Sequence, residues 1–179
     1  MMWTQDAYIK AMNYAAEAHG EQKVQGKPYS YLYHISLVSM EIMACLQHEK
    51  HEKGDFILQC AILHDVLEDT ETSSEHLLFY FSREVLDGVL ALTKNTSIKA
   101  DIRMKECLER IKMQPREIWM VKMADRISNL QEPPAHWDRE KIHHYFGESQ
   151  VIYDELHEAS PYLAQRLAKK IEAYRNYLT

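Results

Sequence analysis

Four residues that can bind a metal ion or carry a proton lie within one short apolar stretch. They are His64, Asp65, Glu68 and Asp69, inside the run Ala-Ile-Leu-His-Asp-Val-Leu-Glu-Asp-Thr at 61–70. A carboxylate in such surroundings is unstable unless a cation or hydrogen-bond donors compensate its charge. A divalent metal ion is the most economical compensation, so the run indicates a hydrolase site. A helix end with solvated acids is the alternative, and it fits the His-Asp pair badly.

A second polar cluster lies near residue 125. Lys122, Asp125 and Asn129 recur at three- and four-residue spacing, which places them on one face of a helix. Asp125 is flanked by apolar residues, so we expect its side chain to point inward. One interpretation is an ion pair between Lys122 and Asp125 on a partly exposed face. The other, favoured by the presence of the first cluster, is that Asp125 is a metal ligand.

His34 is the third candidate, at the start of an apolar helical stretch. A single His in such a stretch is more often a satisfied core residue than a ligand. The preceding loop, Gly26-Lys27-Pro28-Tyr29, carries a positive charge and favours a place near a site. Other histidines lie in charged or polar stretches and are expected to have no ligand role: His48, His51, His143 and His144.

The elements that must position these residues are helices. Apolar residues recur at helical spacing along most of the chain, and Gly and Pro number only 5 each. We expect helices over 4–19, 31–47, 55–69, 83–93, 98–113, 115–130, 137–156 and 161–178, with a short one after the capping signal at 72–75. Asp55 is expected to cap the helix that carries the first cluster. No shift in composition marks a second domain.

Composition and charge narrow the range of functions. The 179 residues carry a formal net charge of −6, which gives no electrostatic case for binding nucleic acid or anionic membranes. We find no membrane-spanning run and no signal-peptide pattern. Three scattered cysteines match neither a disulfide framework nor a zinc pattern, so we expect a cytoplasmic protein. A small anionic substrate stays compatible with this charge, and a homo-oligomer is left open.

The order of these motifs resembles the HD superfamily of metal-dependent phosphohydrolases. Within it, His-Asp-x-x-Glu-Asp at 64–69 is similar to the hydrolase domain of RelA/SpoT-type enzymes and of small stand-alone alarmone hydrolases. Those enzymes remove pyrophosphate from the 3′ position of (p)ppGpp with Mn²⁺. The resemblance covers most of the chain and includes residues 18–19, 26–29, 34, 63–70, 87–89, 93–94 and 122–130. It implies an all-α fold, with residues 1–179 forming a single HD hydrolase domain, an orthogonal helical bundle around the metal.

The resemblance also implies roles for individual residues. Those that match the family's metal ligands are His34, His64, Asp65 and Asp125. Glu68 and Asp69 match the acidic pair that acts on the attacking water, and Asn129 matches a substrate-contacting Asn. Two His nitrogens and two carboxylates suit one Mn²⁺ or Fe²⁺ ion and do not exclude Zn²⁺. We further expect Lys23, Lys27 and Lys122 to neutralise phosphate charge.

The chain departs from the alarmone-hydrolase pattern in the loop at 23–24, in the stretch 28–35 and at Glu132. Lys23 and Val24 stand where the family loop usually has Arg and Lys, the Arg stacking on guanine. The predicted function is a metal-dependent phosphohydrolase of a phosphorylated nucleotide, similar to guanosine 3′,5′-bis(diphosphate) 3′-pyrophosphohydrolase. Two alternatives stay open: an HD-type nucleotidase or phosphatase of another phosphorylated metabolite, and a non-catalytic metal-binding helical sensor.

Overall fold

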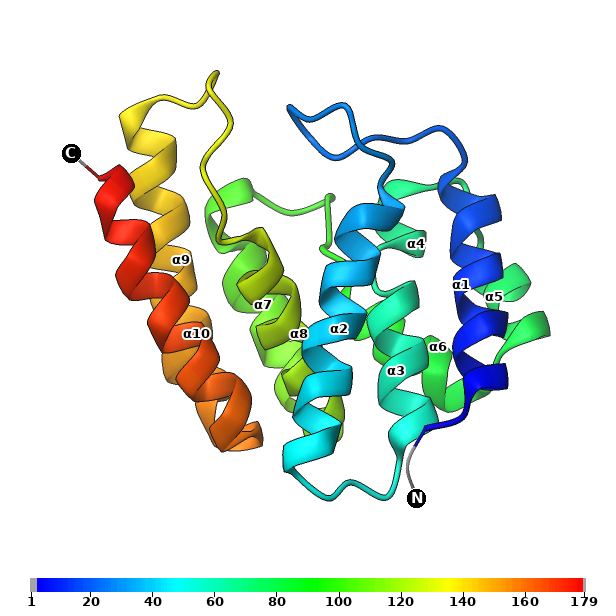
Figure 1. Cartoon of the computed structure of the whole chain (residues 1–179). Helices are drawn as coiled ribbons and strands as arrows, with labels where there is room; N and C mark the ends of the chain where they lie inside the picture. The colour runs from blue at the N-terminus through cyan, green and yellow to red at the C-terminus, as the bar shows by residue number, and fades with distance from the viewer. Residues whose placement is uncertain (1–2, 179) are drawn as a thin grey trace.

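The structure is a computed structural model that describes residues 3–178, and this part of the chain consists of helices and connecting loops, without a strand. Figure 1 shows the arrangement of the helices. Their bounds are α1 Gln5–His19, α2 Leu32–His48, α3 Gly54–Leu63, α4 Val66–Asp69, α5 Ser74–Tyr80, α6 Arg83–Leu92, α7 Ala100–Lys112, α8 Arg116–Asn129, α9 Arg139–Leu156 and α10 Pro161–Tyr174, with short 3₁₀ turns at His157–Ala159 and Arg175–Tyr177. The predicted all-α class is confirmed. None of these helices is both long and apolar enough to cross a membrane.

Side-chain caps begin several helices close to where the sequence predicts them. The hydroxyl of Thr4 accepts a hydrogen bond from a backbone N–H of α1, and Ser73 and Ser82 do the same for α5 and α6. Asp138 caps α9 and Ser160 caps α10 in this way. Each such cap contributes about 1 kcal/mol because it satisfies a donor that the helix itself leaves unpaired.

The helix expected over 55–69 is in fact two helices, and that prediction is wrong. α3 ends at Leu63 and α4 begins at Val66, with Asp65 at φ −104° and ψ −2° between them. The His64 Nδ1–H donates a hydrogen bond of 2.8 Å to the carbonyl of Ala61. In a continuous helix, this carbonyl would accept from the backbone N–H of Asp65. The side chain thus competes with the backbone and ends the helix.

Asp55 does not cap α3, contrary to expectation. Its carboxylate accepts hydrogen bonds from the backbone N–H and the hydroxyl of Thr4, at 2.5 and 3.1 Å. The start of α3 is therefore joined to the start of α1. Lys53 occupies the cap position of α3 without a side-chain hydrogen bond.

A continuous cluster of buried apolar residues runs through the bundle, with α2, α3 and α8 at its centre. α1 packs against α3 on one side, and α9 and α10 cover α8 on the other (Figure 1). The α1–α2 and α8–α9 loops lie at the same end of the bundle as α4 (Figure 1). The residues with candidate chemistry come from this end.

Gly88 lies where α6 meets both α3 and α8. A Cβ atom at this position would lie 2.6 Å from Cδ1 of Ile118 and 3.0 Å from Sγ of Cys60. Both distances are shorter than ordinary van der Waals contact, so the absence of a side chain lets α6 approach. Gly147, in α9, is the opposite case, because a Cβ atom there meets nothing within 4 Å.

Gly88→Val is expected to lower the free energy of unfolding by about 1–3 kcal/mol, because the added isopropyl group overpacks the crossing. Gly147→Val is the matched control and should change it by no more than about 0.5 kcal/mol. Urea unfolding followed by circular dichroism measures both. Equal effects of the two substitutions would contradict the close approach at Gly88.

Candidate metal centre and binding cavity

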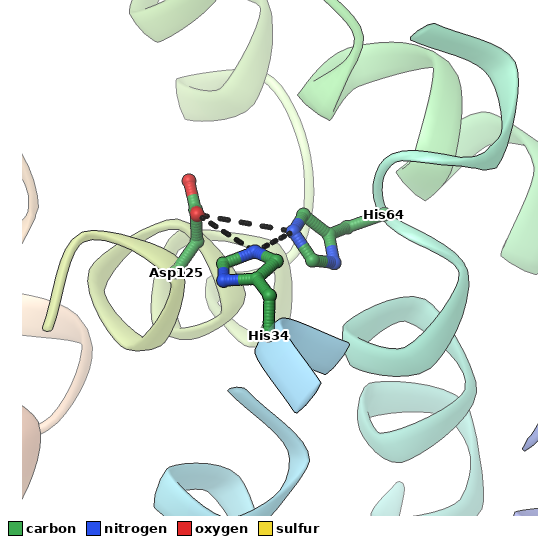
Figure 2. Close-up of side chains that lie close together, drawn as sticks. All are labelled: His34, His64 and Asp125. Carbon is green, nitrogen blue, oxygen red and sulfur yellow. Dashed lines mark hydrogen bonds and ion pairs between the residues drawn. The ribbon is translucent and has the colours of Figure 1, made fainter. Parts of the chain in front are cut away.

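Three buried side chains, from α2, the residue after α3, and α8, lie close together (Figure 2). His34 lies in the first turn of α2, His64 directly follows α3, and Asp125 lies in α8; they are 5%, 3% and 8% exposed. The Nε2 atoms of the two histidines are 3.2 Å apart. Oδ1 of Asp125 lies 3.5 Å from Nε2 of His34 and 3.8 Å from Nε2 of His64. The ligand atoms of the three residues fall within 4.8 Å of one another, which is the spacing a metal ion requires.

Asp65 approaches both histidines of this cluster. Its Oδ2 atom lies 2.9 Å from Nε2 of His64 and 3.6 Å from Nε2 of His34. The same oxygen accepts a hydrogen bond of 2.5 Å from the hydroxyl of Tyr31. The four predicted ligands are thus brought together, although Asp65 is outside the tight group formed by the other three.

The charges of the cluster balance one another. Burial alone would lower the pKa of His64, but the charges of Asp65 and Asp125 raise it to about 9. Burial alone would raise the pKa of both carboxyls, yet the histidines hold the pKa of Asp65 well below its usual range. Lys122, followed by His64, lowers the pKa of Asp125. A divalent cation suits this site because it can replace the proton that His64 carries between two carboxylates.

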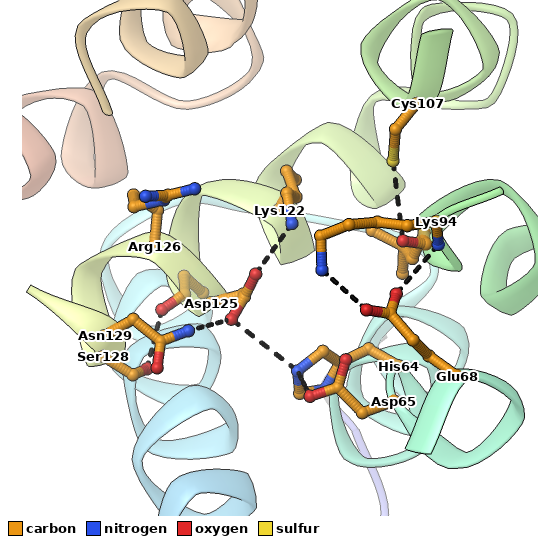
Figure 3. Close-up of polar contacts among 12 residues, drawn as sticks. His64, Asp65, Glu68, Lys94, Cys107, Lys122, Asp125, Arg126, Ser128 and Asn129 are labelled. Atoms are coloured by element: carbon orange, nitrogen blue, oxygen red, sulfur yellow. Dashed lines mark hydrogen bonds and ion pairs between the residues drawn. The ribbon is translucent and has the colours of Figure 1, made fainter. Parts of the chain in front are cut away.

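The predicted acidic pair contacts different partners. The Glu68 carboxylate accepts hydrogen bonds from the backbone N–H and from Nζ of Lys94, at 2.8 and 2.7 Å (Figure 3). Asp69 Oδ2 lies 3.4 Å from Nε2 of Gln22, which belongs to the α1–α2 loop. The four residues of the first cluster therefore do not lie on one continuous helix, because the chain turns at residue 65. Burial, followed by the charge of Asp65, raises the pKa of Asp69.

Lys122 and Asn129 both bind Asp125 in α8 (Figure 3). Nζ of Lys122 lies 2.9 Å from Oδ2, and Nδ2 of Asn129 donates to Oδ1 at 2.6 Å. Lys122 is only 5% exposed, so the ion pair forms in the interior rather than on a partly exposed face. Both features expected of this segment are therefore present, because Asp125 points inward and is also paired with Lys122. The expected contact of Lys122 with phosphate stays a prediction.

A cavity of about 560 Å³ adjoins the cluster. It is bounded by the α1–α2 loop, the start of α2, the end of α8 and the α8–α9 loop, and its lining includes His34, Asp69 and Asn129. Lys23 and Lys27 line it as well, and their expected contact with phosphate stays a prediction. A larger cavity of about 840 Å³ lies between α7 and α9 and contains none of the predicted site residues.

Several residues that position the site were not predicted from the sequence. The Tyr31 ring stacks on His19 with centroids 4.6 Å apart, and Nδ1 of His19 lies 2.7 Å from Oε1 of Gln22. Lys94 holds Glu68, as described above. His19 and Lys94 belong to the segments that resemble the family, but the residue pattern assigns them no role; Tyr31 and Gln22 carry no sequence signal of their own.

The pKa of His64 implies that the stability of the metal-free protein depends on pH. A His whose pKa rises on folding from 6.5 to about 9 adds stability that is fully present below pH 6.5 and lost as the pH rises through 9. We expect the free energy of unfolding to fall by up to about 3 kcal/mol across this window. Urea unfolding in the presence of a chelator measures it, and His64→Gln should remove most of the slope. A flat wild-type profile would contradict the proposed charge balance.

The chain is similar in sequence to several known proteins, although no family model matches it. Guanosine-3′,5′-bis(diphosphate) 3′-pyrophosphohydrolase MESH1 of Danio rerio is 29% identical over 152 residues, covering 80% of this chain and 81% of that protein. The MESH1 protein of Xenopus tropicalis is 27% identical, covering 77% and 78%. A guanosine-3′,5′-bis(diphosphate) 3′-pyrophosphohydrolase of Aquifex aeolicus (strain VF5) is 30% identical over 126 residues, which are 68% of this chain and 17% of that protein.

The fold agrees as well. A solved structure described as a metazoan ortholog of SpoT that hydrolyses ppGpp superposes with a TM-score of 0.82 at 24% identity, covering 100% of both chains. A Listeria monocytogenes structure, lmo0812, gives a TM-score of 0.60 at 20% identity, covering 84% of this chain and 97% of that one. The resemblance to guanosine-3′,5′-bis(diphosphate) 3′-pyrophosphohydrolases, predicted from the motifs, is therefore confirmed in sequence and in fold.

Proposed function

We propose that this protein is a metal-dependent phosphohydrolase that removes pyrophosphate from the 3′ position of (p)ppGpp or a closely related nucleotide. The observation that carries the proposal is the buried His34–His64–Asp125 group beside a cavity lined by lysines. It occurs in a chain that resembles such enzymes over about four fifths of its length. The net charge of −6 gives no electrostatic case for nucleic acid, and it stays compatible with a small anionic substrate held in a local pocket.

The residues present fit one divalent ion. His34, His64, Asp65 and Asp125 would hold it, and their two imidazoles and two carboxylates suit Mn²⁺, with Fe²⁺ and Zn²⁺ as alternatives. The fit rests on the donor set, because two buried imidazole nitrogens 3.2 Å apart face each other beside two carboxylates. When bound, the ion lowers the pKa of a coordinated water and polarises the scissile phosphate.

Glu68 and Asp69 would divide the handling of the water between them. Glu68 is fixed by two hydrogen bonds to Lys94, so it can orient a water molecule without moving. Asp69 lines the cavity, and its raised pKa makes it a better proton acceptor than an ordinary Asp. We therefore assign the proton transfer to Asp69 and the orientation of the water to Glu68.

The substrate would lie in the cavity between the two loops. Lys23 and Lys27 would neutralise its phosphates, and Asn129 would contact the sugar or a phosphate. Aromatic rings of Tyr29 and Trp137 line the same cavity and offer faces on which a base can stack. Three free, buried cysteines agree with action in a reducing cytoplasm.

A phosphatase or nucleotidase of another phosphorylated metabolite is the second candidate. It is favoured by Lys23 and Val24, which line the cavity where the alarmone hydrolases usually have Arg and Lys. The Arg of those enzymes stacks on guanine, so its replacement weakens the case for that base. The products separate the two candidates, since the first releases pyrophosphate and the second releases inorganic phosphate.

The first test incubates Mn²⁺-loaded protein with a nucleotide panel that includes ppGpp. We expect pyrophosphate release, and we expect Asp65→Ala and Asp125→Ala to lose both bound metal and turnover. Asp87→Ala removes a partly exposed acid of α6 that pairs with Arg83 at the surface, and it should keep both. Full turnover with unchanged metal content in Asp65→Ala would rule out the proposed centre.

The second test separates the acidic pair from the ligands. Glu68→Gln and Asp69→Asn should each lower kcat by about 10²–10⁴-fold while the metal content stays at the wild-type level. Glu71→Gln, a change at a neighbouring exposed acid, is the control and should leave kcat unchanged. Metal analysis and steady-state kinetics give both readouts, and a loss of metal with Asp69→Asn would make that residue a ligand instead.

A further inference from the structure

A second group of potential metal ligands lies at the other end of α2. It consists of Cys45 in the last turns of α2, Glu49 at its C-terminus and His51 in the following loop. Sγ of Cys45 lies 3.7 Å from Oε2 of Glu49, and Nε2 of His51 lies 3.5 Å from the same oxygen. All three ligand atoms fall within 4.8 Å of one another. The extended backbone of Glu49, at φ −126° and ψ 136°, turns the chain so that these atoms converge.

The imidazole of His51 lacks a hydrogen-bond partner in this group. Its Nε2 atom is buried, and although Glu49 is 3.5 Å away, the geometry is not that of a hydrogen bond. A buried polar atom without a partner costs about 1–3 kcal/mol, so such atoms are rare. A cation between the nitrogen, the carboxylate and the thiol would remove this cost.

The distances fit a tetrahedral ion. Zinc bonds of about 2.3 Å to sulfur and about 2.0 Å to nitrogen and oxygen give ligand–ligand separations of roughly 3.3–3.6 Å. The two separations from Oε2 of Glu49, 3.7 Å to Sγ of Cys45 and 3.5 Å to Nε2 of His51, are close to these values, and the third lies within 4.8 Å. One thiolate, one carboxylate and one neutral imidazole also balance the two positive charges of the ion.

The group is separate from the His34–His64–Asp125 centre. Cys45 follows His34 by eleven residues along α2, which is roughly 16 Å at the helical rise. In Figure 1 this end of α2 lies beside the N-terminal end of α10, away from the α1–α2 and α8–α9 loops. Ser160 Oγ lies 3.3 Å from Sγ of Cys45, and Glu49 Oε1 accepts a hydrogen bond from the N–H of Tyr162 at 2.7 Å.

We propose that Cys45, Glu49 and His51 form a second metal site that takes Zn²⁺. Binding replaces the thiol proton of Cys45, which is released to solvent, and leaves a fourth position for a water molecule. The ion joins the C-terminal end of α2 to the loop that follows it. Because Ser160 and Tyr162 contact two of the three ligands, it also strengthens the attachment of α10.

The test uses metal-stripped, full-length protein titrated with Co²⁺, which reports a thiolate ligand by a sulfur-to-metal charge-transfer band. The His34–His64–Asp125 centre contains no sulfur, so it cannot give this band. We expect the band in the wild type and its loss in Cys45→Ala. Cys107→Ala is the matched control, because Cys107 is also free and buried but its thiol faces backbone carbonyls of α6, and the band should persist.

A second pair of variants keeps the test valid if Cys45→Ala does not fold. His51→Gln should lose the band and the Zn²⁺-dependent rise in Tm at this site, which is about 5–10 °C when free Zn²⁺ is a hundredfold above Kd. His48→Gln is the control, since His48 is exposed at the same helix end and stacks on Tyr162. No band in the wild type, or an unchanged band in His51→Gln, would overturn the proposal.

Discussion

The structure depends on keeping two carboxylates ionised in a largely dry interior. The side chains of Asp65 and Asp125 are only 18% and 11% exposed, and a buried charge without a partner would destabilise the fold by several kcal/mol. The partners come from three helices: His34 from α2, His64 from the end of α3 and Lys122 from α8. The central packing of α2 against α3 and α8 therefore serves to bring compensating charge to these two residues.

Two neighbouring residues of the cluster, His64 and Asp65, lie at the break between α3 and α4. In a continuous helix, successive side chains point about 100° apart and do not face each other. At the break, Nε2 of His64 lies 2.9 Å from Oδ2 of Asp65. The bond from Nδ1 of His64 to the carbonyl of Ala61 then fixes the ring, which leaves Nε2 directed at the other members of the cluster. One hydrogen bond thus ends the helix and orients the imidazole.

The sequence predicts the parts of this site that depend on local pattern. Helix periodicity gave most of the helix bounds and the inward direction of Asp125, and the motif order selected His34. The end of α3 at His64 was not predicted, because the apolar spacing continues across it. The hydrogen bond that ends the helix involves a side chain, which the spacing does not show. Two further contacts were not predicted because they join residues that are distant in the sequence: Tyr31 with Asp65, and Lys94 with Glu68. No local pattern encodes a pairing between residues 26 or 34 positions apart.

The two ends of α2 carry different chemistry on one stiff element. His34 in the first turn owes its position to packing against α3 and α8, whose residues His64 and Asp125 complete the cluster. A close-packed interior fixes the distances among these three residues within a narrow range, so an ion at the far end of α2 is not needed for it. A metal ion at Cys45 would act on a different contact, because Ser160 and Tyr162 at the start of α10 bind the residues around it. Its effect should thus fall on the stability of the bundle, while the spacing of the His34–His64–Asp125 cluster stays under the control of the core.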